Sequence, residues 1–280
     1  MGILLLITAS SLVAQGVRWT GSTSYSRGSY IFDATTHTLS LSNGLTVTLG
    51  KLEVSGTLPL LMQNSQWVSQ VGGIPLPTGG KESAVVQRRG PGETVGSRKG
   101  TGGAGNALAT EVTYRDAFAW SVGDPFFSAS SELFGGTGAL RSVRMHVSSK
   151  APVRGIESGV GTGEWDVGVG GSAFANLAGT FLFADMAYWW FGDLPDLELR
   201  DGITYGMGLS RAILDAKGSL SLSFFGAAPM IESMERPASI ALGLGYSTRL
   251  GRSLSGGVAA GLSEASPDLS VYFGWSLTVR

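Results

Sequence analysis

The sequence predicts an all-β fold, an antiparallel transmembrane β-barrel of about 12 strands. Apolar side chains recur at every second position in segments of about ten residues, the length that a tilted strand needs to cross a bilayer. The connections between these segments alternate between short and long, as they do in outer-membrane barrels. The chain also contains 43 glycines and only 15% charged residues, against about 25% in a typical soluble domain.

The last segment shows the alternation in its strictest form. In "DLSVYFGWSLTVR" the alternating apolar side chains are Leu269, Val271, Phe273, Trp275, Leu277 and Val279. Because successive side chains of a strand point to opposite faces, one face is apolar and the other is small and polar. We expect the apolar face to meet lipid, where only a closed sheet can pair every backbone group. The opposite face then lines a lumen that contains water.

The same period of two recurs along the chain. The segments that show it are 17–25, 39–49, 52–60, 127–134, 142–150, 164–174, 180–190, 203–213, 219–227, 239–250, 254–263 and 269–279. Gly50 and Lys51 are expected to form a two-residue turn. The other short connections are 135–140, 175–179, 214–218 and 251–253, and the longer ones are 26–36, 62–116, 151–164, 191–201 and 229–237. We expect 62–116 to be a polar, glycine-rich external loop.

The N-terminal residues indicate export. An apolar run from Ile3 to Ala14 has the length of a signal-peptide core, so 1–14 are expected to be a signal-peptide remnant and 15–280 the barrel. The alternative is a buried first strand or helix. Another apolar stretch, 180–192, is too short for a membrane helix, which needs about 20 apolar residues. The predicted location is the bacterial outer membrane.

Composition excludes several classes of function. The net charge of -1 and the lack of a dense basic run argue against a nucleic-acid partner. The absence of cysteine excludes disulfides and thiolate metal sites. His37 lies near Asp33 in a predicted loop, and a metal site needs more ligands than this. The glycine strings "GVGTG" and "GTGGAG" lack the strand-to-helix context of phosphate-binding loops, so no cofactor is expected.

Aromatic residues are expected to form girdles where the barrel meets the membrane surfaces. Those on or near the outward face are Tyr25, Trp165, Tyr188, Trp190, Tyr205, Tyr246, Phe273 and Trp275. The alternative is a soluble β-sandwich or lipocalin-like barrel whose apolar faces point inward. Such a protein would carry more lysine and glutamate on its exterior than the serine and glycine found here.

Three stretches carry a family resemblance: "NGLTVTLGKLEVSGTLPLL", "VGDPFFSASSEL" and "SGVGTGEWDVGVGGS". From about residue 36 the chain resembles the bacterial outer-membrane transporter family of the phenol meta-cleavage pathway. It departs from the family at "KAPVRG", where the family has Pro-Thr-Gly. The resemblance implies a barrel that passes small, often aromatic or hydrophobic, compounds across the outer membrane.

The alternation also predicts which side chains line the lumen and the solute pathway. The charged and polar ones are Glu53, Glu132, Arg144, His146, Lys150, Asp166, Asp185 and Arg249, and the aromatic ones are Phe181, Phe183 and Trp189. Mixed charges across a bore stiffen a barrel and set ion preference. Aromatic groups on the same face would contact a hydrophobic solute, or would simply narrow the lumen. The expected partners are membrane lipid and small solutes, and a monomer is favoured.

Two other functions remain open from the sequence. His146 and Ser148 lie two apart on one strand and share a face, so they could form the base and nucleophile of a lipid-acting enzyme. Against this, the alternation places both on the lumen side, away from lipid. The second alternative is a structural barrel that does not conduct.

Overall fold

The computed structural model describes residues 16–32, 35–65, 68–78, 119–153, 160–194, 197–232, 234–248 and 251–279. Its strands are β1 (Gly16–Gly28), β2 (Thr36–Leu49), β3 (Leu52–Gln63), β4 (Ser69–Val71), β5 (Ile74–Leu76), β6 (Ala119–Val122), β7 (Phe126–Gly135), β8 (Leu140–Lys150), β9 (Asp166–Leu177), β10 (Thr180–Trp190), β11 (Gly202–Ile213), β12 (Gly218–Ala227), β13 (Ala238–Ser247), β14 (Arg252–Gly261) and β15 (Leu269–Val279). Among these residues, no helix has the length and apolar character to cross a membrane.

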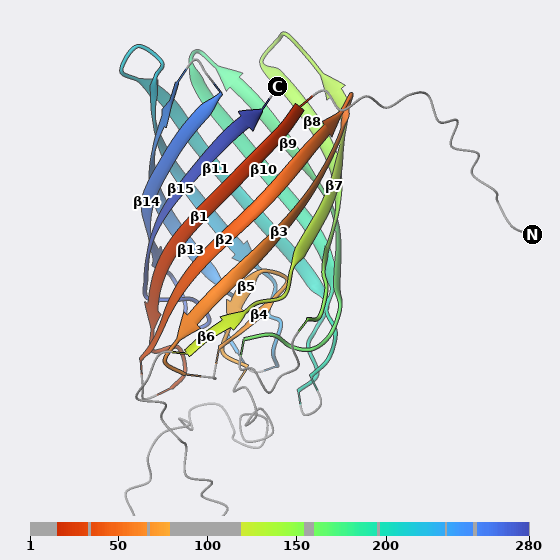
Figure 1. Ribbon diagram of the computed structural model, residues 1–280, viewed down its shortest axis with the longest axis vertical. Coiled ribbons are helices and arrows are strands. Elements are labelled where there is room, and N and C mark those ends of the chain that lie inside the picture. Colours follow the sequence, from red (N-terminus) through yellow and green to blue (C-terminus); the bar gives the residue numbers. More distant parts are fainter. Residues whose placement is uncertain are drawn as a thin grey trace, which may run out of the picture.

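All of these strands except β4 and β5 belong to one antiparallel sheet, which closes into a barrel (Figure 1). The first strand pairs with the last, from Val17 opposite Val279 to Arg27 opposite Leu269, and β2 pairs with both β1 and β3. Of the 13 strands in this sheet, β6 pairs only with the far end of β3, so twelve strands run around the barrel. Closure leaves no edge strand exposed to lipid. The predicted fold class is confirmed.

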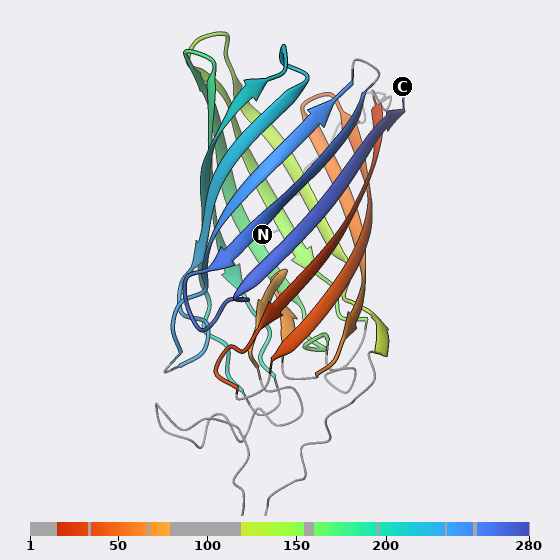
Figure 2. The same cartoon turned by 90° about the vertical axis from the view of Figure 1, so that its left-hand side faces the viewer.

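Short turns gather at one end of the barrel and long connections at the other. Gly50 follows β2 with a φ of 65°, and Ala178 and Gly179 join β9 to β10 with φ values of 51° and 83°. These left-handed conformations suit two-residue hairpins between twisted strands. The described chain begins and ends at this same end (Figures 1 and 2). We call it the inner end, and the end with the long connections the outer end.

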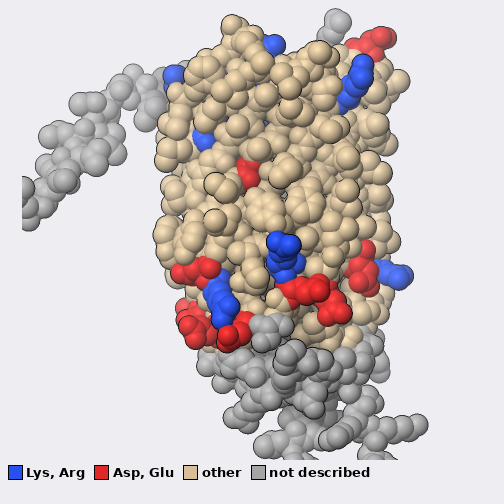
Figure 3. Space-filling view, turned by 180° about the vertical axis from the view of Figure 1, so that it is seen from behind, with Lys and Arg blue, Asp and Glu red and all other residues tan. Residues whose placement is uncertain are grey.

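The outer surface of the barrel is apolar between two charged rims. Seen from behind, Lys, Arg, Asp and Glu gather mostly toward the outer end, and a wide band of other residues covers most of the wall above it (Figure 3). The exposed large side chains include Leu45 at 56%, Met186 at 58% and Leu244 at 60%. Apolar side chains this exposed need a lipid neighbour. Together with sheet closure, this band places the protein in the bacterial outer membrane.

The aromatic residues expected at the membrane surfaces lie on this outward face. Trp19 packs edge-on against Trp275, with ring centroids 6.1 Å apart. Tyr188 and Trp190 are likewise in edge-on contact at 5.0 Å. His37 lies on β2 rather than in a loop, and its Nδ1 is 2.7 Å from the hydroxyl of Tyr25. The imidazole therefore has a tyrosine partner on the neighbouring strand β1.

Candidate functional site

Four neighbouring strands line one side of the lumen with hydroxyl groups. On β1 and β2, Ser24 lies opposite Ser40 and Ser26 lies opposite Thr38. Ser26 also lies opposite Ser270 on β15. These residues alternate with lipid-facing leucine, valine and tyrosine, so their hydroxyl groups point inward. We call this side of the lumen, on β15, β1, β2 and β3, the hydroxyl wall.

A short hairpin made of β4 and β5 lies inside the outer end of the barrel (Figure 1). It turns at Gly72 and Gly73, whose φ values are 54° and 85°. Part of the segment predicted as an external loop therefore folds back into the bore. A Cβ atom on Gly72 would come within 2.7 Å of the Phe191 ring, so glycine permits both the turn and the close contact.

Apolar side chains hold this hairpin against β10, β12 and the connections that follow these two strands. Trp189 and Phe191 stack with ring centroids 6.1 Å apart, and the Trp189 Nε1 donates a hydrogen bond of 3.2 Å to Thr204. The buried cluster comprises Val71, Ile74, Leu76, Ala187, Trp189, Phe191, Leu194, Leu197, Leu199, Ala227, Met230 and Ile231. Burial of this apolar surface stabilises the docked hairpin.

A buried ion cluster lies beside the hairpin. The Lys150 Nζ is 3.0 Å from Asp166 and 3.5 Å from Asp124, and the three side chains are 1%, 0% and 0% exposed. Lys150 faces Asp166 directly, because the two residues are cross-strand partners on β8 and β9. Asp124 also accepts a hydrogen bond of 3.0 Å from the backbone of Val153. Charges this deeply buried need such partners.

The hairpin backbone completes the cluster. The Lys150 Nζ donates to the carbonyl of Gln70 at 3.3 Å, and the Gly72 N–H donates to Asp166 at 2.7 Å. On its other oxygen, Asp166 accepts a hydrogen bond of 3.1 Å from Gly192. The ion cluster therefore joins the barrel wall to the hairpin.

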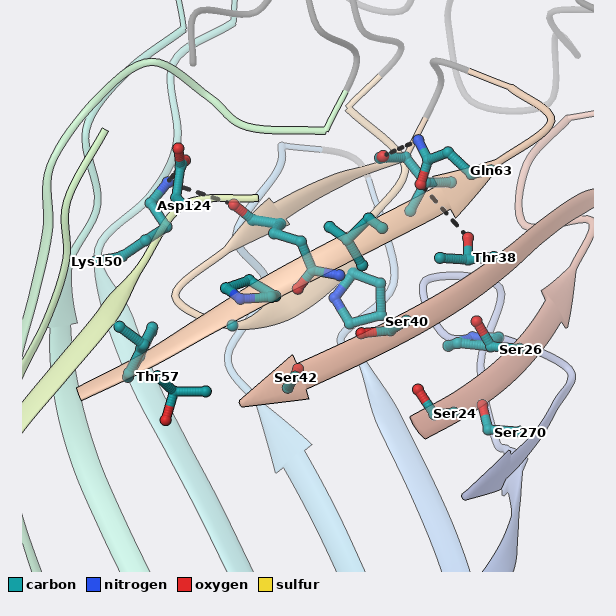
Figure 4. A pocket seen from close by; sticks show the side chains of 18 of the residues that line it. Ser24, Ser26, Thr38, Ser40, Ser42, Thr57, Gln63, Asp124, Lys150 and Ser270 are labelled. Atoms are coloured by element: carbon teal, nitrogen blue, oxygen red, sulfur yellow. Dashed lines mark hydrogen bonds and ion pairs between the residues drawn. The ribbon is translucent and has the colours of Figure 1, made fainter. Parts of the chain in front are cut away.

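Between the hairpin and the hydroxyl wall lies a cavity of about 550 Å³ (Figure 4). This volume falls within the range of about 300–1,000 Å³ that is usual for small-molecule sites. The lining comprises Ser24, Ser26, Thr38, Ser40, Ser42, Thr57, Pro59, Leu61, Gln63, Val68, Gln70, Gly72, Gly73, Pro75, Asp124, Phe126, Lys150, Pro267 and Ser270. The cavity thus has hydroxyl groups on one side and mainly apolar groups and backbone on the other.

Further charges face the lumen nearer the inner end. The Arg144 guanidinium lies 2.7 Å from Glu53, with the two side chains 27% and 28% exposed, and donates to Ser130 at 2.9 Å. Glu132 accepts a weak hydrogen bond of 3.4 Å from Ser142. Partial exposure and mixed sign suit the wall of a water-filled bore.

Midway along the barrel, His146 faces Asp185 across the intervening strand β9. The Nδ1 and the carboxylate are 3.7 Å apart, with side-chain exposures of 18% and 45%. Gly170 makes room for the imidazole, because a Cβ there would come within 2.5 Å of the Nε2. The separation is too long for a hydrogen bond. Ser148 is on the same face and buried at 8% exposure, so these residues do not form a catalytic array open to lipid.

Three phenylalanines face the lumen on the inner half of β9 and β10. Phe174 and Phe181 stack with ring centroids 5.6 Å apart. Phe183 is 38% exposed, and its ring covers Gly208 on β11. These rings give the inner half of the lumen an apolar patch.

The predicted lumen residues fall into separate groups. Lys150, Asp166 and Trp189 are buried around the hairpin and do not face open water. Arg249 lies outside the described residues. The remaining residues face the bore between the hairpin and the inner end, and their role in a solute pathway stays a prediction. Among the described residues, no group of three or more His, Asp or Glu is placed to hold a metal ion.

Sequence reasoning did not identify the hairpin, Asp124 or the cavity. The "VGGI" turn is a hairpin signal in itself, because two adjacent glycines suit the tightest turns. Its strands have only three residues each, which is too short for a periodicity to be read. Asp124 lies between strands, so its inward orientation could not be read from alternation.

Comparisons with known proteins agree with this architecture. No family model matches the chain, and no curated protein sequence matches it significantly. Among solved structures, an outer-membrane channel from Pseudomonas putida F1 is similar, with a TM-score of 0.61 and 12% identity over 96% of this chain and 97% of that one. The translocator domain of the autotransporter NalP from Neisseria meningitidis gives a TM-score of 0.49 and 10% identity over 95% and 90%. The chain has the fold of a bacterial outer-membrane β-barrel.

Proposed function

We propose that this protein is an outer-membrane channel for the passive passage of small solutes, including aromatic and hydrophobic compounds. The observation that carries the proposal is the cavity of about 550 Å³ beside the docked hairpin. The hairpin occupies one side of the bore and leaves the hydroxyl wall uncovered by described residues. A structural barrel would gain stability by filling this space, because tight packing maximises contacts.

The chemistry of the lumen supports the same proposal. Hydroxyl groups offer hydrogen bonds without a fixed charge, so a solute exchanges water for protein partners at little cost. The apolar side of the cavity and the stacked rings of Phe174 and Phe181 would contact apolar parts of a solute. A link to phenol meta-cleavage compounds is part of this proposal and follows from the family resemblance. We expect the protein to act as a monomer without a cofactor and without catalytic activity.

Reconstitution tests the proposal against both alternatives. The purified barrel should give conductance in planar bilayers and allow liposomes to swell in small neutral solutes. Absence of both would reject the channel and favour a structural barrel. A lipid-acting enzyme would instead hydrolyse phospholipid and lose that activity in Ser148→Ala, while Ser130→Ala, which alters another inward hydroxyl, would keep it.

A further inference from the structure

The seam between β3 and its neighbours is interrupted at the level of the cavity. β3 pairs with β7 up to Thr57 opposite Phe126, and with β6 from Leu60 opposite Val122. Two residues of β3 and three residues of the facing chain, 123–125, lie between these ladders without regular pairing. By contrast, β1 and β2 pair without a break from residue 16 to residue 28. The described register shifts in β7–β8 and β8–β9 lie toward the inner end, away from the cavity.

Proline weakens the backbone connection across this interruption. The Pro59 carbonyl accepts a hydrogen bond of 2.8 Å from the Gly123 N–H. A residue in an antiparallel ladder directs its N–H and its C=O toward the same neighbour, so the N–H that proline lacks would have faced this seam. The facing segment contains a second proline, Pro125. One of the usual ladder bonds is therefore missing at this point.

Side-chain contacts close the seam where backbone bonds do not. A Cβ on Gly123 would lie 2.9 Å from the Pro59 ring and 3.0 Å from Leu61, so both side chains rest directly on the glycine backbone. Asp124 points inward to the buried Lys150 and fixes the facing segment from the lumen side. Only the backbone hydrogen bond from Gly123 to Pro59 is described across this interruption, so separating it costs fewer backbone partners than separating a continuous ladder of the same length.

The interruption lies between the cavity and the lipid. On the inside, Thr57, Pro59 and Phe126 line both the cavity and the seam. On the outside, Leu58 is 45% exposed and Phe127 is 48% exposed. These outward side chains are apolar, as a surface in contact with acyl chains requires.

A polar group on the lipid-facing side marks the same place. Asn43 lies directly opposite Leu58 on β2, on the outward side of the barrel, and is exposed. A polar side chain facing the hydrocarbon region is costly and generally functional. Beside the interrupted seam, this amide can hydrogen-bond a polar substituent of a departing solute.

We infer that the seam between β3 and β6–β7 is a lateral portal through which uncharged, mainly apolar solutes pass from the cavity into the membrane. The inference rests on the proposed channel function, because solutes must first reach the cavity. A solute with a mainly apolar surface gains free energy on entering lipid, whereas a hydrophilic solute does not. The barrel would therefore release apolar solutes sideways and hydrophilic solutes through the inner end.

A disulfide staple across the seam tests the portal. The chain has no cysteine, so Leu60→Cys with Val122→Cys, which lie directly opposite each other, introduces a single pair of thiols. Cross-strand partners have Cβ atoms about 4.5–5.5 Å apart, close to the geometry of a disulfide. The matched control is Val47→Cys with Val54→Cys, an outward pair on the continuous β2–β3 seam.

The probe is N-phenyl-1-naphthylamine, an uncharged aromatic amine that fluoresces in lipid. Gram-negative cells producing each variant are mixed with it, and the rate of the fluorescence rise is measured before and after reduction. We expect the oxidised seam staple to lower uptake to the rate of cells without the protein, and reduction to restore it. The control staple should leave uptake unchanged. Swelling of liposomes in a neutral pentose should be the same for every form.

Other results would overturn the portal. The portal is rejected if probe uptake is unchanged by the oxidised seam staple, or if uptake falls equally with the control staple. The portal is also rejected if the wild-type protein passes the pentose but gives no probe uptake above background. In that case the channel function stands. A wild-type protein without conductance and without swelling rejects the channel itself, and the portal with it.

Discussion

Replacing Lys150 with methionine should release the β4–β5 hairpin from the barrel wall. The ammonium group lies between two fully buried carboxylates at 3.0 Å and 3.5 Å. It also donates to Thr162 at 2.6 Å and to the hairpin carbonyl of Gln70 at 3.3 Å. Methionine keeps most of the length of the side chain and removes its charge. In the variant, the docked hairpin would cover two carboxylates that have lost their cation.

The size of the effect follows from the burial of the cluster. Removing one partner of a buried ion pair costs about 3–5 kcal/mol, because a charge is left without compensation. Undocking the hairpin would relieve this cost by admitting water to Asp124 and Asp166. Since about 1.4 kcal/mol corresponds to a tenfold change in an equilibrium constant, the docking equilibrium should shift by about 10²- to 10⁴-fold toward the undocked state.

Single-channel recording in planar bilayers measures this shift. Lys150→Met should spend a larger fraction of time in a high-conductance state than the wild type, and its unfolding midpoint should fall. Lys51→Met alters an exposed lysine in an inner-end turn and should behave like the wild type. The triple variant Lys150→Met, Asp124→Asn, Asp166→Asn also removes the two uncompensated carboxylate charges. Its unfolding midpoint and its occupancy of the high-conductance state should therefore return much of the way to the wild-type values.

Two results would refute this reasoning. If Lys150→Met leaves both conductance and the unfolding midpoint unchanged, the ion cluster does not hold the hairpin. If the triple variant is as impaired as the single one, the loss comes from packing or hydrogen bonding rather than from stranded charge.

Three further predictions concern the barrel and its lumen. Without boiling, the detergent-extracted barrel should migrate differently on gels than after boiling, and a protein that is soluble without detergent would contradict the fold. Arg144→Ala and Asp185→Ala should insert normally and change ion preference in opposite senses, measured as reversal potentials in a salt gradient; a raised unfolding midpoint in Arg144→Ala, with selectivity unchanged, would indicate a lipid-facing arginine instead. Gly72→Ala should destabilise the docked hairpin by at least about 1–2 kcal/mol, because the φ of Gly72 is 54° and the new Cβ would meet Phe191. In the control Gly50→Ala, the φ is 65° and the new Cβ has nothing within 4 Å. The control should therefore lower the unfolding midpoint less than Gly72→Ala and leave conductance unchanged.

The barrel could be predicted because a lipid-facing strand has a strict chemical pattern. Leu39, Leu41, Leu45 and Val47 alternate with serine, glycine and threonine, and this alternation alone fixes which face is outward. A shift of one residue would place every hydroxyl in lipid, so the register is strongly determined. The turn at Gly50 was equally predictable, because two alternating runs separated by two residues are typical of a hairpin with a two-residue turn.

The ion cluster could not be predicted, because it depends on how strands far apart in sequence are aligned. Alternation placed Lys150 and Asp166 on the inward face, but it did not say that they are direct partners. That pairing follows from the register of β8 against β9. Asp124 joins them from an irregular segment, and the hairpin adds backbone groups that carry no sequence signal. Inward orientation is a local property, whereas burial depends on what else occupies the bore.

The two ends of the lumen are suited to different kinds of selection. At the outer end, Lys150 lies between the carboxylates of Asp124 and Asp166, and Asp166 also accepts two backbone N–H hydrogen bonds, so the charges of the cluster largely compensate one another. The neighbouring wall carries hydroxyl groups without charge. Nearer the inner end, Arg144 and Asp185 are 27% and 45% exposed and can act on passing ions through water. We therefore expect charge to be selected near the inner end, and size and hydrogen-bonding capacity in the cavity, where substitution of Ser40 or Ser42 should alter solute preference without changing ion preference.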